Sequence, residues 1–338
     1  MFRNTMSTGH GTRRRVVLGL AVTALLAATT GCSALGSNDS STSGGNASVE
    51  KAKINVAIIT TIDLAPFHLA NKNGYFKQEG LDVEFSVNPS SPVALQKVIS
   101  GEADIAFASY VPVFTAQDKG AADLKIVADS VSASPNSNMV MTTPNSSVKT
   151  VKDLAGKKIG IPAPGTASDT MTKAVMKANG VDFSKVQWVL TPFTDMATAL
   201  SKGDIDAAYM PEPFITNSAK SVGAVPVVDV ASGPTEDFPI GGYAALAKFT
   251  SANPKTVAAF QRAMKKATDE AADRAKIQPM IVEFAKVDAD TAALVTLPNF
   301  HSTLDPRRLQ RVPDQLQEYG ITSKRIDVSS MLVQSATS

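Results

Sequence analysis

The chain has 338 residues, 43% of them hydrophobic, with one cysteine and a formal net charge of +2. The first 31 residues contain four arginines and no acid, so the remaining 307 residues carry a formal charge of −2. No basic tract remains that would favour nucleic acid, and a single cysteine excludes an internal disulfide. A chain of this length can bury the cores of about two domains.

Residues 1–31 have the features of an export signal: a basic start, an apolar run of about 15 residues and small residues at its end. The run is shorter than the roughly 20 residues of a membrane-spanning helix. Cys32 follows Thr30-Gly31 and resembles the lipid-attachment site of a bacterial lipoprotein, although Thr29 stands where Leu is usual. We expect a chain anchored at the outer face of the cytoplasmic membrane by lipid on Cys32. The alternative is ordinary secretory cleavage without lipid attachment. The export route can be either the general secretory or the twin-arginine pathway.

Residues 32–52 are rich in Ser, Gly and Asn and predict a flexible linker. The next 80 or so residues alternate apolar, β-branched runs with amphipathic runs, which predicts strands alternating with helices. In chain order these are INVAIIT from Ile54, a helix over 66–73, LDVEFSVN from Leu81, a helix in SPVALQKVIS from Ser91, then ADIAFAS and LKIVADSV.

The same order restarts after residue 144 and predicts a second α/β unit. Its elements are KKIGIPAPG from Lys157, a helix from Thr166 to Gly180, VQWVL from Val186, a helix in TDMATALSKG, IDAAYM from Ile205 and VPVVDV from Val225. Two βαβα units predict two largely parallel sheets covered by helices.

The last third is helical and has no matching strands of its own. NPKTVAAFQRAMKKATDEAADRA from Asn253 predicts a long helix, and DPRRLQRVPDQLQEYG predicts another, interrupted or kinked at Pro313. These helices must pack on a unit already built, which indicates that the chain leaves the first unit, builds the second and returns.

We therefore expect lobe 1 to comprise residues 53–143 and 241–338, and lobe 2 to comprise residues 144–240. A chain that crosses twice between lobes has a two-strand hinge, which we place near Met139–Pro144 and Ile240–Tyr243.

One stretch is echoed in both units: GEADIAFASYVPVF from Gly101 and GDIDAAYMPEPF from Gly203. Each predicts a helix ending at Gly, then a strand, then a turn with proline. Ligands bind beyond the carboxyl ends of strands in open α/β sheets, so the turns are candidates for a site. Asp104 and Asp206 begin the strands, and we expect them to be solvated or turn-capping acids at the far edge.

The stretch TTIDLAPFHLANKNGYFKQEGLDVEF resembles the opening of the nitrate/sulfonate/taurine-type solute-binding proteins of ABC importers, a group related to thiamine-pyrimidine-binding proteins. SGEADIAFAS, VKDLAGKKIGIPAPGTAS, GDIDAAYMPEPF and GGYAAL follow in the family's order, so the resemblance covers Ile54 to Pro313. It implies an α/β, two-lobed type II periplasmic-binding fold with two parallel-rich sheets and a two-strand hinge. Such a monomer closes on a small solute and delivers it to a permease, and through it to an ATPase.

Carried over by position, the resemblance places the ligand site on four turns. These supply Thr61, Asp63, Pro66, Phe67, Ser109, Tyr110, Gly165, Thr166, Ala167, Ser168, Tyr209, Glu212 and Pro213. We expect no metal and no cofactor there.

The turn at Gly165 precedes a helix, whose free N–H groups favour an anionic or electron-rich ligand group. The hydroxyls of Thr166 and Ser168 can contact the ligand, cap the helix, or do both. Three other residues also have a structural alternative: core packing for Tyr209 and Phe67, and a turn-holding role for Glu212.

The charges near these turns favour some ligands over others. Every arginine after the leader lies at position 262 or beyond, and no lysine lies in the turns, whereas Asp63 and Glu212 do. Since a site for a fully ionised anion often uses arginine, we expect a neutral, cationic or zwitterionic solute. A taurine-like aminosulfonate or an aromatic heterocycle fits this description better than nitrate.

The sequence favours a binding protein over an enzyme. His68 and His301 are the histidines after the leader, and no metalloprotease, nucleophile-elbow or phosphate-loop motif is present. Pyrimidine synthases among the relatives carry a cysteine-rich motif that has no counterpart here. A ligand-sensing lipoprotein remains the alternative to an importer component, because both functions need only closure on a solute.

Overall fold

A computed structural model describes residues 48–334 of the chain. The predicted export signal, Cys32 and the linker up to residue 47 lie outside the described residues. Within residues 48–334, no helix combines the length and the hydropathy that a membrane span requires.

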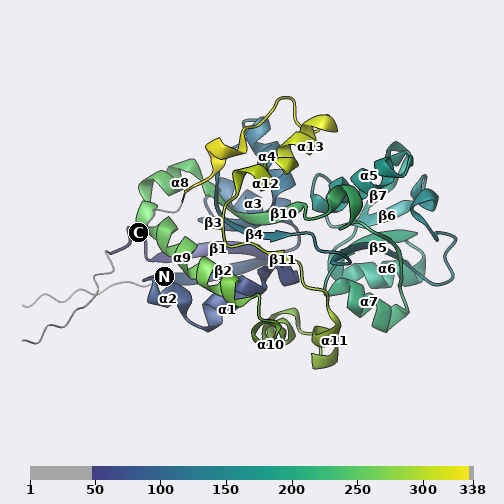
Figure 1. The fold of residues 1–338 in the computed structure, drawn as a ribbon, viewed down its shortest axis with the longest axis horizontal. Helices are drawn as coiled ribbons and strands as arrows, with labels where there is room; N and C mark the ends of the chain where they lie inside the picture. Colours follow the sequence, from purple (N-terminus) through teal and green to yellow (C-terminus); the bar gives the residue numbers. More distant parts are fainter. Residues whose placement is uncertain (1–47, 335–338) are drawn as a thin grey trace, which may run out of the picture. The chain divides into compact units, whose positions relative to one another are not determined.

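The first sheet has six strands in the order β11-β4-β10-β3-β1-β2 (Figure 1). Strand β1 is parallel to β2 and β3, whereas β10 is antiparallel to both β3 and β4. The bounds are β1 Lys53–Ile59, β2 Asp82–Asn88, β3 Ile105–Ser109, β4 Leu124–Ser132, β10 Pro239–Leu246 and β11 Asn299–Phe300.

The second sheet has five strands in the order β7-β6-β8-β5-β9. Strand β6 is parallel to β7 and β8, and β5 is antiparallel to β8 and β9. The bounds are β5 Asn138–Thr142, β6 Lys158–Ile161, β7 Gln187–Leu190, β8 Ala207–Pro211 and β9 Val225–Asp229. Both sheets are mixed and contain fewer parallel strand pairs than predicted. The reason is that β5 and β10, the first strand after each crossing between the sheets, are antiparallel to their neighbours.

The chain crosses between the sheets in two connections, residues 133–137 and 230–238. They lie side by side: the Ala133 N–H donates to the Phe238 carbonyl (2.9 Å) and the Val230 N–H donates to the Asn138 carbonyl (3.0 Å). The expected crossing points at 139–144 and 240–243 are displaced, since most of those residues belong to β5 and β10. We keep two lobes as a proposal, with one sheet in each and with β5 moved to the second lobe.

Helices pack beside both sheets, and the C-terminal helices return to the first sheet as predicted. Helix α9 packs on α1 and β4, α13 packs on α4, and α11 contacts α7 of the second unit. The bounds are α1 Ala65–Lys72, α2 Tyr75–Gln78, α3 Ser91–Ser100, α4 Tyr110–Asp118, α5 Ala167–Ala178, α6 Met196–Lys202, α7 Phe214–Val222, α8 Ala247–Ala252, α9 Pro254–Glu270, α10 Arg274–Ala285, α11 Ala289–Leu294, α12 Pro306–Leu309 and α13 Arg311–Glu318.

The predicted break in the last long helix lies three residues earlier than expected. Helix α12 ends at Leu309, α13 begins at Arg311, and Pro313 lies in the first turn of α13. A first-turn proline lacks only an N–H that has no partner within the helix, so it does not itself break the helix there.

Candidate functional site

A small cavity of about 40 Å³ lies where the two sheets meet, at the carboxyl ends of their parallel strands. Ile59 ends β1, Ser109 ends β3 and Pro211 ends β8, and all three line the cavity. This is the edge at which open α/β sheets bind ligands, and residues from both sheets contribute. The other lining residues are Thr61, Asp63, Ser90, Ser91, Phe107, Asn138, Pro162, Thr166, Ala167, Ser168, Phe193, Tyr209 and Ile240.

The cavity brings together seven of the thirteen residues that the sequence suggested. These are Thr61, Asp63, Ser109, Thr166, Ala167, Ser168 and Tyr209. Whether each contacts a ligand stays a prediction, but they come from all four expected turns. Two of them, Ser109 and Tyr209, belong to strands β3 and β8.

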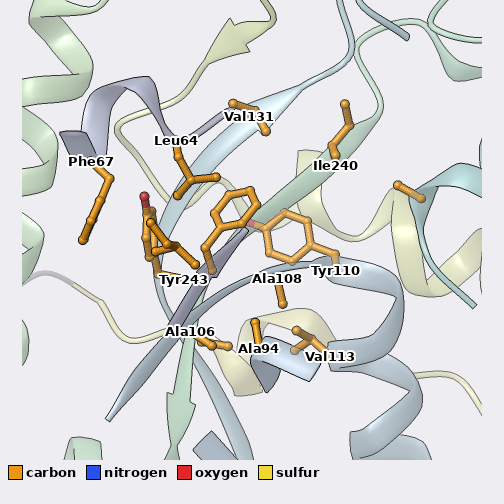
Figure 2. Packing of buried hydrophobic residues seen from close by; sticks show 14 of the residues in the cluster. Leu64, Phe67, Ala94, Ala106, Ala108, Tyr110, Val113, Val131, Ile240 and Tyr243 are labelled. Carbon is orange, nitrogen blue, oxygen red and sulfur yellow. The ribbon is translucent and has the colours of Figure 1, made fainter. Parts of the chain in front are cut away.

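Phe67 and Tyr110 lie in the hydrophobic core (Figure 2), and neither lines the cavity. The Phe67 ring lies 6.2 Å from the ring of Tyr243 and is buried in the core of the first sheet. The Tyr110 hydroxyl donates a hydrogen bond to Asp129 (2.7 Å), whose other carboxylate oxygen pairs with Arg308. Pro66 is buried in the first turn of α1. The resemblance located these turns but did not show which way their side chains point.

Glu212 holds a turn and also joins the second unit to the C-terminal segment. Its carboxylate accepts hydrogen bonds from the Thr216 N–H (3.1 Å), the Thr216 hydroxyl (2.8 Å) and the Thr296 N–H (3.3 Å). It is 3% exposed, and this burial raises its pKa. Pro213 follows and precedes α7, and Gly165 forms the left-handed turn before α5; neither lines the cavity.

Asp63 is the one charged side chain among the cavity-lining residues. It lies in a single 3₁₀ turn after β1 and accepts a hydrogen bond from the Thr61 hydroxyl (2.9 Å). It is 8% exposed, and among residues 48–334 no basic side chain forms an ion pair with it. Burial therefore raises its pKa to about 6, so the carboxylate is ionised at neutral pH without a counter-ion.

The first turn of α5 forms the facing wall with Thr166, Ala167 and Ser168. The Thr166 hydroxyl donates to the Ala163 carbonyl (3.0 Å), so Ser168 is the donor in the Thr166–Ser168 hydroxyl pair (2.6 Å). Thr166 and Asp169 form a capping box, in which Asp169 accepts from the Thr166 N–H (2.9 Å) and the Thr166 side chain accepts from the Asp169 N–H. The N–H groups of a first helical turn have no intrahelical acceptor and attract electron-rich groups.

Sequence reasoning missed the hydrogen-bonding residues Ser90, Ser91 and Asn138. Ser90 and Ser91 follow the carboxyl end of β2, so the strand-end rule contained the signal for them. Asn138 begins an antiparallel strand, and its side-chain oxygen accepts from the Tyr209 hydroxyl (2.5 Å). That pairing depends on tertiary structure and left no local pattern in the sequence.

Ser109 offers a free hydroxyl to the cavity. Its N–H donates to the Ser91 hydroxyl oxygen (3.0 Å), but its own Oγ is one of the few buried side-chain atoms in residues 48–334 without a hydrogen-bond partner. A buried unsatisfied hydroxyl costs stability, so a ligand group that bonds to it recovers that energy. With Asp63, the α5 N-terminus and the Phe107, Phe193 and Tyr209 rings, this arrangement offers hydrogen-bond donors, acceptors and an apolar surface to a small polar solute.

Comparison with known proteins places these features in context. A family model described as NMT1/THI5 like matches residues 61–276. A putative thiamine biosynthesis protein of Haemophilus influenzae is 25% identical over 301 residues, covering 84% of this chain and 92% of that protein. The 4-amino-5-hydroxymethyl-2-methylpyrimidine phosphate synthase of Aspergillus parasiticus is 27% identical over 61% of this chain and 62% of its own length.

The solved structures support the predicted architecture. The alkanesulfonate-binding protein SsuA of Xanthomonas axonopodis pv. citri, bound to MOPS, superposes with a TM-score of 0.72 at 18% identity. The match covers 85% of this chain and 99% of that one. The chain therefore has the α/β, type II periplasmic-binding-protein fold.

Proposed function

Because the chain belongs to the NMT1/THI5-like family, we propose that it is the extracytoplasmic solute-binding component of an ABC import system. The cavity between the two sheets captures a small solute, and the closed protein delivers it to a permease driven by an ATPase. The N-terminal signal and lipid attachment at Cys32 would keep the protein at the outer face of the cytoplasmic membrane. The observation that carries the proposal is a cavity whose lining comes from both sheets and sets the Asp63 carboxylate and several hydroxyl groups among apolar side chains.

Closure around the solute is supported by ion pairs that cross between the two units. Lys220 of α7 lies 3.1 Å from both carboxylate oxygens of Asp288, just before α11. On α5, Lys177 pairs with Glu318 of α13 at 2.7 Å. A solute shifts the open–closed equilibrium only if it binds the closed form more tightly, which requires contacts to both units.

For the solute we propose a neutral, cationic or zwitterionic compound, either a taurine-like aminosulfonate or an amino-substituted aromatic heterocycle. The unpaired Asp63 carboxylate supplies the counter-charge for a protonated amine or an acceptor for an amino group. The first turn of α5 supplies N–H donors for a sulfonate or a ring nitrogen.

We propose capture without chemical conversion, although a synthase is among the relatives. The lining residues include neither cysteine nor histidine: His68 lies on α1 beside Phe284, and His301 contacts the Ser132 hydroxyl at 2.7 Å. The remaining hydroxyl, amide and aromatic groups suit binding.

A thermal-shift screen of the purified chain tests the proposal. Taurine, ethanesulfonate, 4-aminopyrimidine and nitrate are compared, because a ligand that binds only the folded state raises its melting temperature. We expect stabilisation by taurine or the aminopyrimidine and none by nitrate. Loss of solute uptake on deletion of the gene would support transport, whereas unchanged uptake would favour the sensing alternative.

A further inference from the structure

A second cavity, a groove of about 390 Å³, lies at the outer edge of the first sheet. Its lining comes from the end of β1, from β2, from α1, and from α10 with the residue that follows it. Among residues 48–334, β2 is the last strand of its sheet and no further strand covers this side. The groove is large enough for a small organic molecule, since ligand sites in proteins commonly measure about 300–1,000 Å³.

Three rings from three different elements form one wall of the groove. The His68 ring of α1 stacks on the Phe284 ring of α10 at 4.2 Å, with an angle of 10° between their planes. Phe85 of β2 meets His68 edge-on at 5.7 Å. Because the His68 ring contacts both phenylalanine rings, the wall is organised before any ligand arrives.

Apolar side chains in the groove remain open to water. Phe85 is 41% exposed and Val87 is 58% exposed, and both belong to the short set of large apolar residues exposed in residues 48–334. Adjacent exposed apolar groups are typical of a binding surface, because covering them removes apolar area from water.

Polar groups at the rim favour a ligand with one negative charge. Lys72 pairs with Glu283 at 2.5 Å, whereas Lys286 has no hydrogen bond or ion pair within the described part of the chain. His68 also lines the groove, without a hydrogen-bond partner among residues 48–334, and burial lowers its pKa to about 4. A neutral imidazole adds no charge and offers one donor and one acceptor. Since Lys72 and Glu283 cancel each other, Lys286 leaves the rim with a net positive charge.

We propose that the groove between β2 and α10 is a second small-molecule site, which binds an aromatic or aliphatic acid. The apolar body of the ligand covers Phe85 and Val87, and its acid group faces Lys286. This site does not depend on the solute cavity, whose lining includes neither Phe85, Val87 nor Lys286.

The probe for this site is 8-anilinonaphthalene-1-sulfonate, an aromatic acid whose fluorescence rises in apolar surroundings. The full chain is titrated as wild type, Val87→Glu, Lys286→Gln and Leu190→Glu. Leu190 is the matched control, because it is 68% exposed at the end of β7 in the other sheet. Circular dichroism and melting temperature establish that each variant is folded. We expect the variants to fold, because Val87 and Leu190 are exposed and their replacement leaves the core unchanged.

We expect saturable binding to the wild type, a loss of affinity of at least about tenfold in Val87→Glu and a loss of a few-fold in Lys286→Gln. Binding to Leu190→Glu should match the wild type. The proposal is overturned if the wild type shows no saturable binding, if Val87→Glu binds as tightly as the wild type, or if Leu190→Glu loses as much as Val87→Glu.

Discussion

Strands β3 and β8 begin in the same way. Gly101 and Gly203 end the preceding helices in the left-handed conformation, with φ of 83° and 76°. Asp104 and Asp206 then each accept a hydrogen bond from a backbone N–H at the start of the neighbouring parallel strand, at 3.0 Å from β1 and 2.8 Å from β6. As expected, neither acid lines the cavity; each bonds to a neighbouring strand and does not cap a turn.

The same two strands end differently. Beyond β3, Tyr110 turns into the core and leaves Ser109 at the cavity; in β8, Tyr209 faces the cavity and Glu212 ties the following turn to the C-terminal segment. The similar starts of β3 and β8 therefore have a structural role. Their different ends carry the side chains that can distinguish one solute from another. The substitutions below test that division.

The largest effect is expected for Tyr209→Ala. Tyr209 is 3% exposed and packs against Phe193, so truncation should lower the free energy of unfolding by roughly 3–5 kcal/mol. Tyr209→Phe is the matched control, because it gives β8 the side chain that β3 has at the echoed position, Phe107. It should cost only about 1 kcal/mol, for the hydrogen bond to Asn138. Urea unfolding measures both, and equal losses would contradict this account of β8.

The next effect is a pH dependence that separates Asp63, at the cavity, from the scaffold acids. Its folded-state pKa of about 6 lies above its ordinary value of 3.8, so it favours the folded state fully below about pH 4. That contribution is lost as the pH rises through 6. Asp63→Asn should therefore exceed the wild type in unfolding free energy by about 3 kcal/mol at pH 7.5, at about 1.4 kcal/mol per unit of pKa.

Near pH 4 the two proteins should unfold at similar urea concentrations. A constant difference between them from pH 4 to pH 7.5 would show that Asp63 does not titrate in this range.

Asp63→Asn should also weaken binding of an amine-bearing solute by roughly 10- to 150-fold, because hydrogen bonds to charged groups contribute about 1.5–3 kcal/mol. For the wild type, affinity for such a solute should rise as the pH passes 6, since the ionised carboxylate binds it. Fluorescence or calorimetric titration at pH 5 and pH 7.5 measures this change.

The strand-start acids should behave as a pair. Asp104→Ala and Asp206→Ala each remove one acceptor for a backbone N–H, which should lower the unfolding free energy by about 1 kcal/mol. Asp104→Ala also removes the ion pair with Lys51 (2.7 Å), a surface pair that adds at most about 1 kcal/mol to the loss. Neither should alter solute affinity, because neither lines the cavity. If only one of the two variants changed solute affinity, the proposal that the starts of β3 and β8 have the same structural role would be wrong.

The smallest effect on stability is expected for Ser109→Ala. Its hydroxyl has no hydrogen-bond partner in the described part of the chain, so removing it should change the unfolding free energy by less than about 0.5 kcal/mol. Solute affinity should fall by a few-fold if the hydroxyl bonds to the ligand as proposed. Unchanged affinity would remove Ser109 from the site.

The sequence predicted the fold more completely than the site. Apolar periodicity and the echoed motif identified the strands and helices, and the resemblance gave their arrangement. The crossing points were displaced because nothing local in the sequence marks where a buried strand such as β10 begins. Phe67 and Tyr110 were assigned to the site because the direction of a side chain in a turn depends on packing, and Asn138 was missed because its partner is 71 residues away.

The central claim is that the Asp63 carboxylate selects an amino-bearing solute in the cavity between the sheets. Isothermal titration calorimetry at pH 7.5 with taurine, 4-aminopyrimidine, ethanesulfonate and nitrate tests it most directly, because ethanesulfonate is taurine without the amine. The account predicts saturable binding of taurine or the aminopyrimidine, no detectable binding of ethanesulfonate or nitrate, and loss of the signal in Asp63→Asn. Tight binding of nitrate or ethanesulfonate, with none of the amino compounds, would contradict it.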